Sequence, residues 1–300
     1  MQIFDSIRKT EYKTTVALGF FDGVHKGHAE VVGKCAGLSG KSVATVLTFK
    51  KSPSAVLATK KPLLTSNEVK FRLFEKNGVE DVFCIDFEEV MNLSPYEFVA
   101  DILVAKLNAE CIVTGRNYHF GKGGKAGVDD LRKLCDELGI ELITCDGVMY
   151  EGKMISSTRI RECIALGEIE KANAMLGYDF FIESEIISGN HIGKKLSFPT
   201  INQRLSSEII TPRFGVYATE VVVGERTHKG ATNIGTHPTV GDSEPVCETH
   251  ILDYNGEDLY GETVKTVLRK FIREERKFSN IDELKAQIER DKSEILSFFA

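Results

Sequence analysis

Apolar positions in the first half of the chain form short continuous runs, and amphipathic stretches separate these runs. The runs cover residues 14–21, 42–49, 81–87, 110–114 and 140–145, and each is short enough to predict a buried strand. Helical patterns begin at Ser66, at Ser94-Pro95 and at Val128. Because buried strands that alternate with helices are typical of a parallel sheet with right-handed crossovers, the first half predicts an α/β domain.

The pattern changes near residue 180. Residues 181–188, 215–223, 227–234, 247–254 and 263–272 predict strands without helices between them, and residues 281–299 predict a closing helix. Several antiparallel strands followed by a helix favour a small β-barrel. A chain of 300 residues is long enough for two cores, so we expect two domains, residues 1–180 and 181–300.

Bulk composition narrows the class of protein. The formal net charge of −6 argues against a general nucleic-acid-binding protein. The sequence has no apolar run long enough to span a bilayer, and its first residues lack the basic start and apolar core of a signal peptide. Seven scattered cysteines without a C-x-x-C pair favour reduced thiols over disulfides or a zinc site. We therefore expect a cytoplasmic protein with neither a nucleic-acid nor a membrane partner.

A glycine-rich turn follows the first predicted strand. Gly19, Gly23 and Gly27 occur in the run G-F-F-D-G-V-H-K-G-H, where the chain turns sharply or approaches a ligand closely. This strand–turn–helix position is where α/β sheets bind phosphates. His25 and His28 are three residues apart, so the first turn of a helix points both imidazoles the same way. Two such groups at a helix N-terminus suit the charge that develops on a transferring phosphoryl group.

Two later segments carry groups that suit phosphate and ring ligands. Residues 115–127 combine five glycines with one arginine, two lysines and two aromatic residues, although a surface loop remains the alternative. The run I-S-S-T at residues 155–158 predicts a helix cap whose hydroxyl and N–H groups face phosphate oxygens. Both segments therefore extend the candidate phosphate site.

Together these segments resemble a known family. H-K-G-H at residues 25–28 is similar to the H-x-G-H signature of the nucleotidylyltransferase superfamily, and I-S-S-T-R-I-R at residues 155–161 resembles its I-S-S-T-x-x-R signature. Residues 19–28 resemble the opening of bacterial bifunctional riboflavin kinase/FMN adenylyltransferases, also called FAD synthetases. Residues 115–127 are similar to the flavin-proximal G-x-D-F-x-F-G loop of that family.

The second half resembles the riboflavin kinase module of the same family. L-S-F-P-T-I-N at residues 196–202 is similar to the L-G-x-P-T-A-N motif, and residues 233–239, 248–253, 259–261 and 273–278 match further kinase segments in order. The resemblance covers nearly the whole chain. It implies a nucleotidylyltransferase-type parallel α/β domain, followed by an antiparallel riboflavin kinase barrel with a C-terminal helix.

The resemblance implies two reactions. The barrel would transfer the γ-phosphoryl group of ATP to riboflavin, giving FMN, and the α/β domain would join FMN to the adenylyl group of a second ATP, giving FAD and pyrophosphate. The implied cofactor is Mg²⁺, and ATP is the co-substrate. Both steps depend on positioning and electrostatics, which fits a sequence without an obvious nucleophile constellation.

The resemblance also assigns roles to individual residues. Catalytic roles fall on His25 and His28 at the reacting phosphorus, on Arg161 at the departing pyrophosphate, and on Glu248 as the base toward the riboflavin 5′-hydroxyl. Nucleotide and phosphate binding is assigned to Gly19, Phe20, Asp22, Gly23, Gly27, Ser156, Ser157, Thr158, Gly193, Lys194 and Thr200. Flavin binding is assigned to Asn117, Tyr118 and Phe120, and Mg²⁺ binding to Thr200 and Asn202.

The chain departs from the family pattern in both halves. Lys51 and Ser52 replace a proline and a histidine, and Asn117-Tyr118 replaces Asp-Phe. In the second half, lysine replaces arginine at position 194, and serine replaces glycine at position 197. Two alternatives therefore stay open: a chain that retains only one activity, and a non-catalytic flavin-binding regulator on the same scaffold. The oligomeric state stays open as well.

Overall fold

The chain folds into two units, Met1–Ser157 and Thr158–Ala300. The computed structural model describes residues 1–38, 40, 42–56, 61–188, 200–236, 245–252, 254 and 258–300. Among these residues, no helix is both long enough and apolar enough to cross a membrane.

Six parallel strands form the sheet of the first unit. They are β1 (Gln2–Phe4), β2 (Thr14–Leu18), β3 (Val43–Phe49), β4 (Asp81–Ile85), β5 (Ala109–Gly115) and β6 (Glu141–Cys145). Their order in the sheet is β1-β4-β3-β2-β5-β6, and every pair is parallel. The order reverses between β2 and β5, so the carboxyl end of β2 lies at the point where open α/β sheets bind their ligands.

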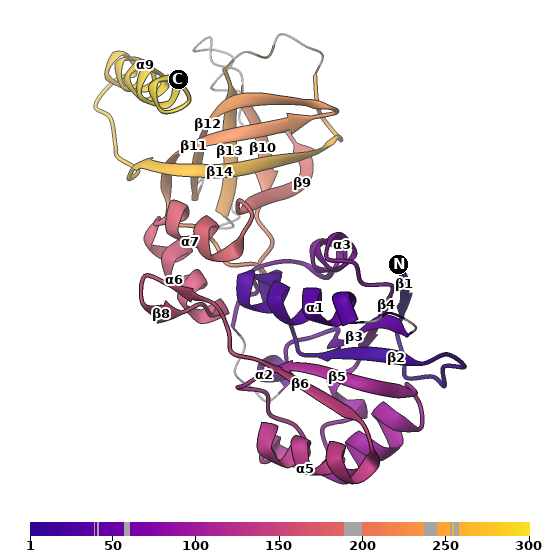
Figure 1. Cartoon of the computed structure of the whole chain (residues 1–300). Helices are drawn as coiled ribbons and strands as arrows, with labels where there is room; N and C mark the ends of the chain where they lie inside the picture. The colour runs from indigo at the N-terminus through magenta and orange to yellow at the C-terminus, as the bar shows by residue number, and fades with distance from the viewer. Residues whose placement is uncertain are drawn as a thin grey trace. The chain divides into compact units, whose positions relative to one another are not determined.

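Helices cover both faces of this sheet, as Figure 1 shows. Helices α1 (Lys26–Leu38) and α3 (Asn67–Lys76) lie on one face, where Val32 and Phe74 pack against β-strand residues such as Val46. Helix α5 (Val128–Leu138) and the π-helical segment η3 (Phe98–Val104) cover the other face. The sheet is therefore buried on both sides, which explains its continuous apolar strands. The remaining elements of this unit are η1 (Asp22–Val24), α2 (Pro53–Val56), η2 (Phe87–Glu89), α4 (Pro95–Glu97), η4 (Lys122–Gly124), β7 (Met149–Tyr150) and β8 (Lys153–Met154).

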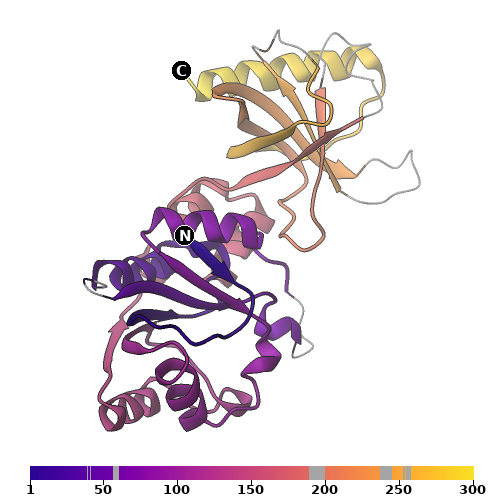
Figure 2. The ribbon, with the colours of Figure 1, turned by 90° about the vertical axis from the view of Figure 1, so that its right-hand side faces the viewer.

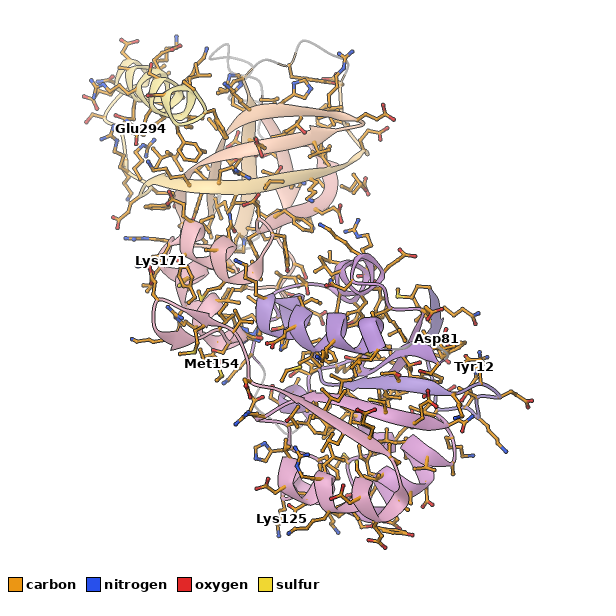
Figure 3. The ribbon with its side chains drawn as sticks, viewed as in Figure 1. Tyr12, Asp81, Lys125, Met154, Lys171 and Glu294 are labelled. Atoms are coloured by element: carbon orange, nitrogen blue, oxygen red, sulfur yellow. The ribbon has the colours of Figure 1, made fainter. Side chains whose placement is uncertain are left out.

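A hydrogen bond between an exposed tyrosine and a buried carboxylate joins the amino ends of β2 and β4. The Tyr12 hydroxyl, just before β2, donates a hydrogen bond to the Asp81 carboxylate at the start of β4 (Figure 3). Burial, together with this bond and the nearby Asp81 charge, raises the pKa of Tyr12 to about 12. The phenol therefore stays protonated and keeps donating through the physiological range.

Six antiparallel strands form a closed barrel in the second unit. They are β9 (Phe181–Ile187), β10 (Thr200–Arg204), β11 (Gly215–Val223), β12 (Arg226–Thr236), β13 (Pro245–Ile251) and β14 (Thr263–Arg273), in the order β10-β13-β12-β11-β14-β9. Helix α9 (Ile281–Phe298) packs against β11, β12 and β14 (Figure 2). The Arg273 guanidinium holds it there, since Nε and Nη2 donate to the buried Asp291 carboxylate at 2.7–3.1 Å.

Two helices before the barrel make hydrogen bonds to distant residues of the second unit. In α6 (Ser157–Leu166), the Ile164 carbonyl accepts the Arg213 main-chain N–H at 3.2 Å. In α7 (Ile169–Leu176), the Asn173 amide donates to the Leu268 carbonyl at 3.0 Å and accepts the Phe180 N–H at 2.8 Å. Because of these bonds, α6 and α7 belong to the second unit, which begins at Thr158. The boundary after residue 180 marks the change from helices to strands and stays a prediction.

The parallel α/β sheet, the barrel and the closing helix confirm the predicted fold class. Differences lie in the short elements. The strand predicted over residues 14–21 ends at Leu18, because residues 19–24 form the glycine-rich turn. Strands β1, β7, β8 and β10 were not predicted, since three of them are two or three residues long and β10 carries the polar sequence T-I-N-Q-R.

Candidate functional site

The turn after β2 adopts a backbone conformation that side chains disfavour. Phe21 has φ 56° and ψ 38°, and Val24 has φ 35°. A left-handed conformation costs a residue with a Cβ about 1–2 kcal/mol. Surrounding contacts must therefore hold the turn, and such stored strain is found mostly at functional sites.

Asp22 supplies part of that support. It is buried, and its carboxylate accepts the Leu64 main-chain N–H at 2.8 Å. The Asp22 carbonyl accepts the Ser157 hydroxyl at 3.1 Å. The structure thus brings the glycine-rich turn and Ser157 together within the first unit, although 135 residues separate these two partners.

The two predicted histidines stack at the N-terminus of α1. Their ring centroids are 3.6 Å apart, and their planes differ by 16°. His25 Nδ1 accepts the His28 main-chain N–H at 3.3 Å, so the imidazole caps the helix as an Asn or Asp side chain would. A Cβ on Gly27 would lie 3.3 Å from the His25 ring, so a larger residue at this position would crowd the imidazole. Because Nδ1 accepts, a neutral His25 ring carries its proton on Nε2.

His28 is held uncharged. Its Nδ1 atom is enclosed and has no hydrogen-bond partner. Burial lowers the pKa of His28 well below the usual 6.5, and the neighbouring His25 and Lys70 lower it further, against a main-chain hydrogen bond with Asp22. An unpaired buried nitrogen is costly, so this atom is a candidate contact for a ligand.

Lys70 is a residue of this site that sequence reasoning does not find. It lies on α3, is 2% exposed, and directs Nζ toward the Phe20 and Phe49 carbonyls at 3.4 Å. A lysine in an amphipathic helix ordinarily indicates a solvent-facing position. The sequence indicates only that Lys70 lies one turn into the helix, four residues after Ser66, the N-cap of α3.

The predicted flavin loop is organised by its own contacts. Phe120 is buried in the apolar cluster that includes Phe98, and Tyr118 stacks on it with ring centroids 5.9 Å apart. Burial raises the pKa of the Tyr118 hydroxyl. Phe120 also pairs with Ala126 across the loop, while Asn117 is exposed. Of the three residues assigned to flavin, Asn117 is therefore the exposed one, and their contact with flavin stays a prediction.

The segment after β3 departs from the family at residues 51 and 52. Lys50 pairs with Asp86 at 2.8 Å, and Lys51 is exposed. The Ser52 hydroxyl lies 2.8 Å from that of Ser54. Of the two lysines, Lys50 already has a carboxylate partner.

The remaining predicted phosphate contacts lie around the start of α6. Ser156 and Thr158 are exposed, and Arg161 is half-buried one turn into the helix. Thr158 and Arg161 belong to the second unit. Their contact with nucleotide stays a prediction.

Neighbouring barrel strands bring the predicted kinase residues together. The Thr200 hydroxyl on β10 donates to Glu248 Oε1 on β13 at 2.7 Å, although 48 residues separate them. Asn202 pairs with Glu248 across the same two strands and is buried. Gly193, Lys194 and Ser197 lie outside the described residues.

Glu248 also has a neighbour on its other side. Asn233 on β12 pairs with it, and the Asn233 amide donates to Glu275 Oε1 at 3.1 Å. A Cβ on Gly235 would lie 1.9 Å from that same oxygen, so the glycine makes room for the Glu275 carboxylate. Sequence motifs pointed to these segments, and the barrel shows which of their side chains meet.

These oxygen groups are of the kind that Mg²⁺ prefers. Thr200 contributes a hydroxyl, Asn202 an amide oxygen and Glu248 a carboxylate, and hard cations favour such donors. Within the described part of the chain, no three His, Cys, Asp or Glu side chains form a metal cluster. The donors fit an ion that also binds substrate phosphates and water.

Comparison with known proteins also divides the chain into an N-terminal and a C-terminal part. The FAD synthetase family model matches residues 7–159, and the riboflavin kinase family model matches residues 176–299. The bifunctional riboflavin kinase/FMN adenylyltransferase of Listeria monocytogenes is 37% identical, covering 97% of this chain and 94% of that protein. The Bacillus subtilis protein of the same name is 36% identical, covering 98% and 95%.

A solved structure is also similar over its whole length. It is described as a macrolide-efflux protein from Streptococcus pneumoniae, with 31% identity and a TM-score of 0.88 over 98% of this chain and 97% of that one. The two family models, the curated relatives and this fold agree in extent and order. The chain belongs to the bifunctional riboflavin kinase/FMN adenylyltransferase family.

Proposed function

We propose that this chain performs both reactions of flavin cofactor synthesis, from riboflavin to FMN and from FMN to FAD. The observation that carries the proposal is that each unit brings its own predicted residues together. His25 stacks on His28 beside the carboxyl end of β2, and Thr200 bonds to Glu248 in the barrel. A non-catalytic flavin-binding regulator would have no need of either arrangement.

In the adenylyl transfer, a phosphate oxygen of FMN attacks the α-phosphorus of ATP. The new O–P bond forms as the bond from that phosphorus to the bridging oxygen breaks, and pyrophosphate leaves with the electron pair. His25 stabilises the negative charge at this centre through its Nε2–H, and His28 holds that ring by stacking on it, since preorganised donors are most effective in an enclosed site. The hydrogen bond from His28 N–H keeps the His25 ring in place, so its Nε2–H needs no reorganisation.

The phosphoryl transfer proceeds in the barrel. Glu248 accepts the proton of the riboflavin 5′-hydroxyl as that oxygen attacks the γ-phosphorus of ATP, and ADP leaves. The Thr200 hydroxyl donates to Glu248 Oε1 and so orients the carboxylate that acts as the base. Thr200 and Asn202 would hold Mg²⁺, which neutralises phosphate charge when it is bound.

Other assignments complete the proposal. Arg161, Ser156 and Thr158 would bind nucleotide phosphates, and Asn117 with Tyr118 would contact the flavin ring, with Phe120 supporting Tyr118 from the core. The seven cysteines are unpaired in the structure, and reduced thiols are typical of the cytoplasm, where we place the protein. Riboflavin, FMN and ATP would be its small-molecule partners.

A time course with riboflavin, ATP and Mg²⁺ tests the proposal, with flavins separated by chromatography. FMN followed by FAD is the expected result. FMN alone would mean that the first unit has lost activity, and FAD from supplied FMN alone would mean that the barrel has. A folded protein that binds flavin and converts neither substrate would refute the enzyme and favour the regulator.

A further inference from the structure

Lys70 crosses from α3 to the end of the sheet beneath the glycine-rich turn. Its Nζ lies 3.4 Å from the Phe20 carbonyl, 3.4 Å from the Phe49 carbonyl and 3.5 Å from Thr48 Oγ1. It also lies 4.5 Å from the Phe20 ring centroid. Phe20 follows β2, whereas Thr48 and Phe49 end β3, so one ammonium group contacts two adjacent strand ends.

These contacts are poor compensation for a buried charge. Desolvating an ammonium group costs several kcal/mol unless a partner of opposite charge or strong hydrogen bonds offset it. Among the described residues, the three hydrogen-bond partners of Nζ are neutral and lie at the long end of the hydrogen-bond range. In the described parts of the chain, Lys70 has no carboxylate within ion-pair distance, so an anionic ligand would complete the compensation.

The turn itself depends on the same group. The Phe20 carbonyl that Nζ contacts also accepts the Thr48 hydroxyl at 3.0 Å, and it immediately precedes the left-handed Phe21. The Phe21 ring in turn packs edge-on against His28, with centroids 5.4 Å apart. A continuous set of contacts therefore joins Lys70 to the histidine pair.

The charged and titratable groups around this pair come from four elements. Lys70 on α3 interacts electrostatically with Asp22 on η1, with the Cys84 thiol on β4 and with His28 on α1, and His28 also faces His25. Asp22 favours the charged form of Lys70, while burial is the larger effect and lowers the Lys70 pKa to about 8. The positive charge of Lys70 helps to keep the pKa of His28 low.

We propose that Lys70 is a positioning residue for adenylyl transfer: its ammonium group fixes the turn that carries the histidine pair and supplies a positive charge behind the nucleotide phosphates. The inference rests on the proposed assignment of this reaction to His25 and His28. Lys70 acts through the turn and through its electrostatic field, because the strand ends enclose it.

Three variants of the full chain test the inference. Lys70→Met removes the charge at similar length, Lys70→Arg keeps it, and Lys76→Met on the exposed side of the same helix is the matched control. The readouts are the pH profile of kcat/KM for FAD formation from FMN and ATP, and the pKa of His28 from NMR. Riboflavin phosphorylation, which the barrel of the same chain performs, is the control and should be unchanged in each variant.

We expect Lys70→Met to lower kcat/KM for FAD by about tenfold to a hundredfold, as loss of a preorganised charge near a transferring phosphoryl group would. The pKa of His28 should rise, since a neighbouring positive charge is gone. In the wild type, kcat/KM should fall as pH rises through about 8, where Lys70 loses its proton, and Lys70→Arg should abolish this fall. Lys76→Met should match the wild type.

An unchanged FAD profile and an unchanged His28 pKa in Lys70→Met would overturn the inference. If Lys70→Met fails to fold, the comparison of wild type with Lys70→Arg decides. A fall of kcat/KM at high pH that persists in Lys70→Arg refutes the inference. A shifted His28 pKa with an unchanged FAD profile would mean that the proposed catalytic site is wrong while the coupling is real. A wild-type chain that forms no FAD would refute the proposed function independently.

Discussion

His25 performs two tasks that substitutions separate. Its ring stacks on His28 with centroids 3.6 Å apart, and its Nδ1 accepts the His28 main-chain N–H at 3.3 Å. His25→Ala removes both the ring and the helix cap. His25→Asn removes the imidazole but keeps a side chain that caps helices well.

The magnitudes follow from these contacts. Loss of an N-cap costs about 1 kcal/mol, and loss of an aromatic stack costs about 0.5–1.5 kcal/mol. His25→Ala should therefore lose about 2 kcal/mol, and His25→Asn about 1 kcal/mol. Because 1 kcal/mol corresponds to roughly 2–4 °C for a domain of 150–250 residues, the two variants should differ by about 3 °C in the Tm of the first unit.

Activity should not follow stability. Both variants lose a preorganised donor at the reacting phosphorus, which typically costs about 10²–10³ in kcat. FAD formation from FMN and ATP should fall by this factor in His25→Ala and His25→Asn alike, while riboflavin phosphorylation in the barrel should not change. Calorimetry of the intact chain and chromatography of the flavins measure the two effects separately.

Two results would refute this reasoning. FAD formation by His25→Asn within tenfold of the wild type would show that the imidazole is not needed at the transferring group. Equal Tm values for His25→Ala and His25→Asn would show that the contact with His28 N–H does not stabilise α1.

Further predictions concern the activity and stability of the barrel and the stability of the first unit at acid pH. Glu248→Gln keeps an oxygen to accept the Thr200 hydroxyl but cannot take a proton, so riboflavin phosphorylation should fall by about 10²–10⁴ while FAD formation from supplied FMN persists; an active variant would exclude Glu248 as the base. Asp291→Ala leaves the Arg273 guanidinium without its carboxylate and should destabilise the barrel by about 3 kcal/mol in urea unfolding, a loss that a solvent-exposed pair would not show. Because the folded-state pKa of His28 is lowered, its contribution to stability is fully present above pH 6.5 and is lost as pH falls toward the folded value, by at most about 1.4 kcal/mol per pH unit. The free energy of unfolding should therefore fall less between pH 7.5 and acid pH in His28→Gln than in the wild type. An equal fall in both proteins would contradict the lowered pKa.

Much of the architecture was predictable because periodicity is local. Continuous apolar runs that alternate with amphipathic stretches specify buried parallel strands, and their loss near residue 180 marks the change to a barrel. The spacing of His25 and His28 predicted that their imidazoles point the same way, and the two rings stack with nearly parallel planes. Each of these features depends on residues close in the sequence.

Other features depend on which segments meet in space. Lys70 lies within the site because it contacts the ends of β2 and β3 from α3, although nothing in the sequence of α3 distinguishes it from a solvent-facing lysine. Thr200 reaches Glu248 because β10 pairs with β13, and α6 and α7 belong with the barrel because of hydrogen bonds to residues far along the chain. Sequence determined the kind of element and the chemistry each motif offers. Only the tertiary structure decided the partners, since burial of a charge and the register of paired strands depend on contacts between residues far apart in the chain.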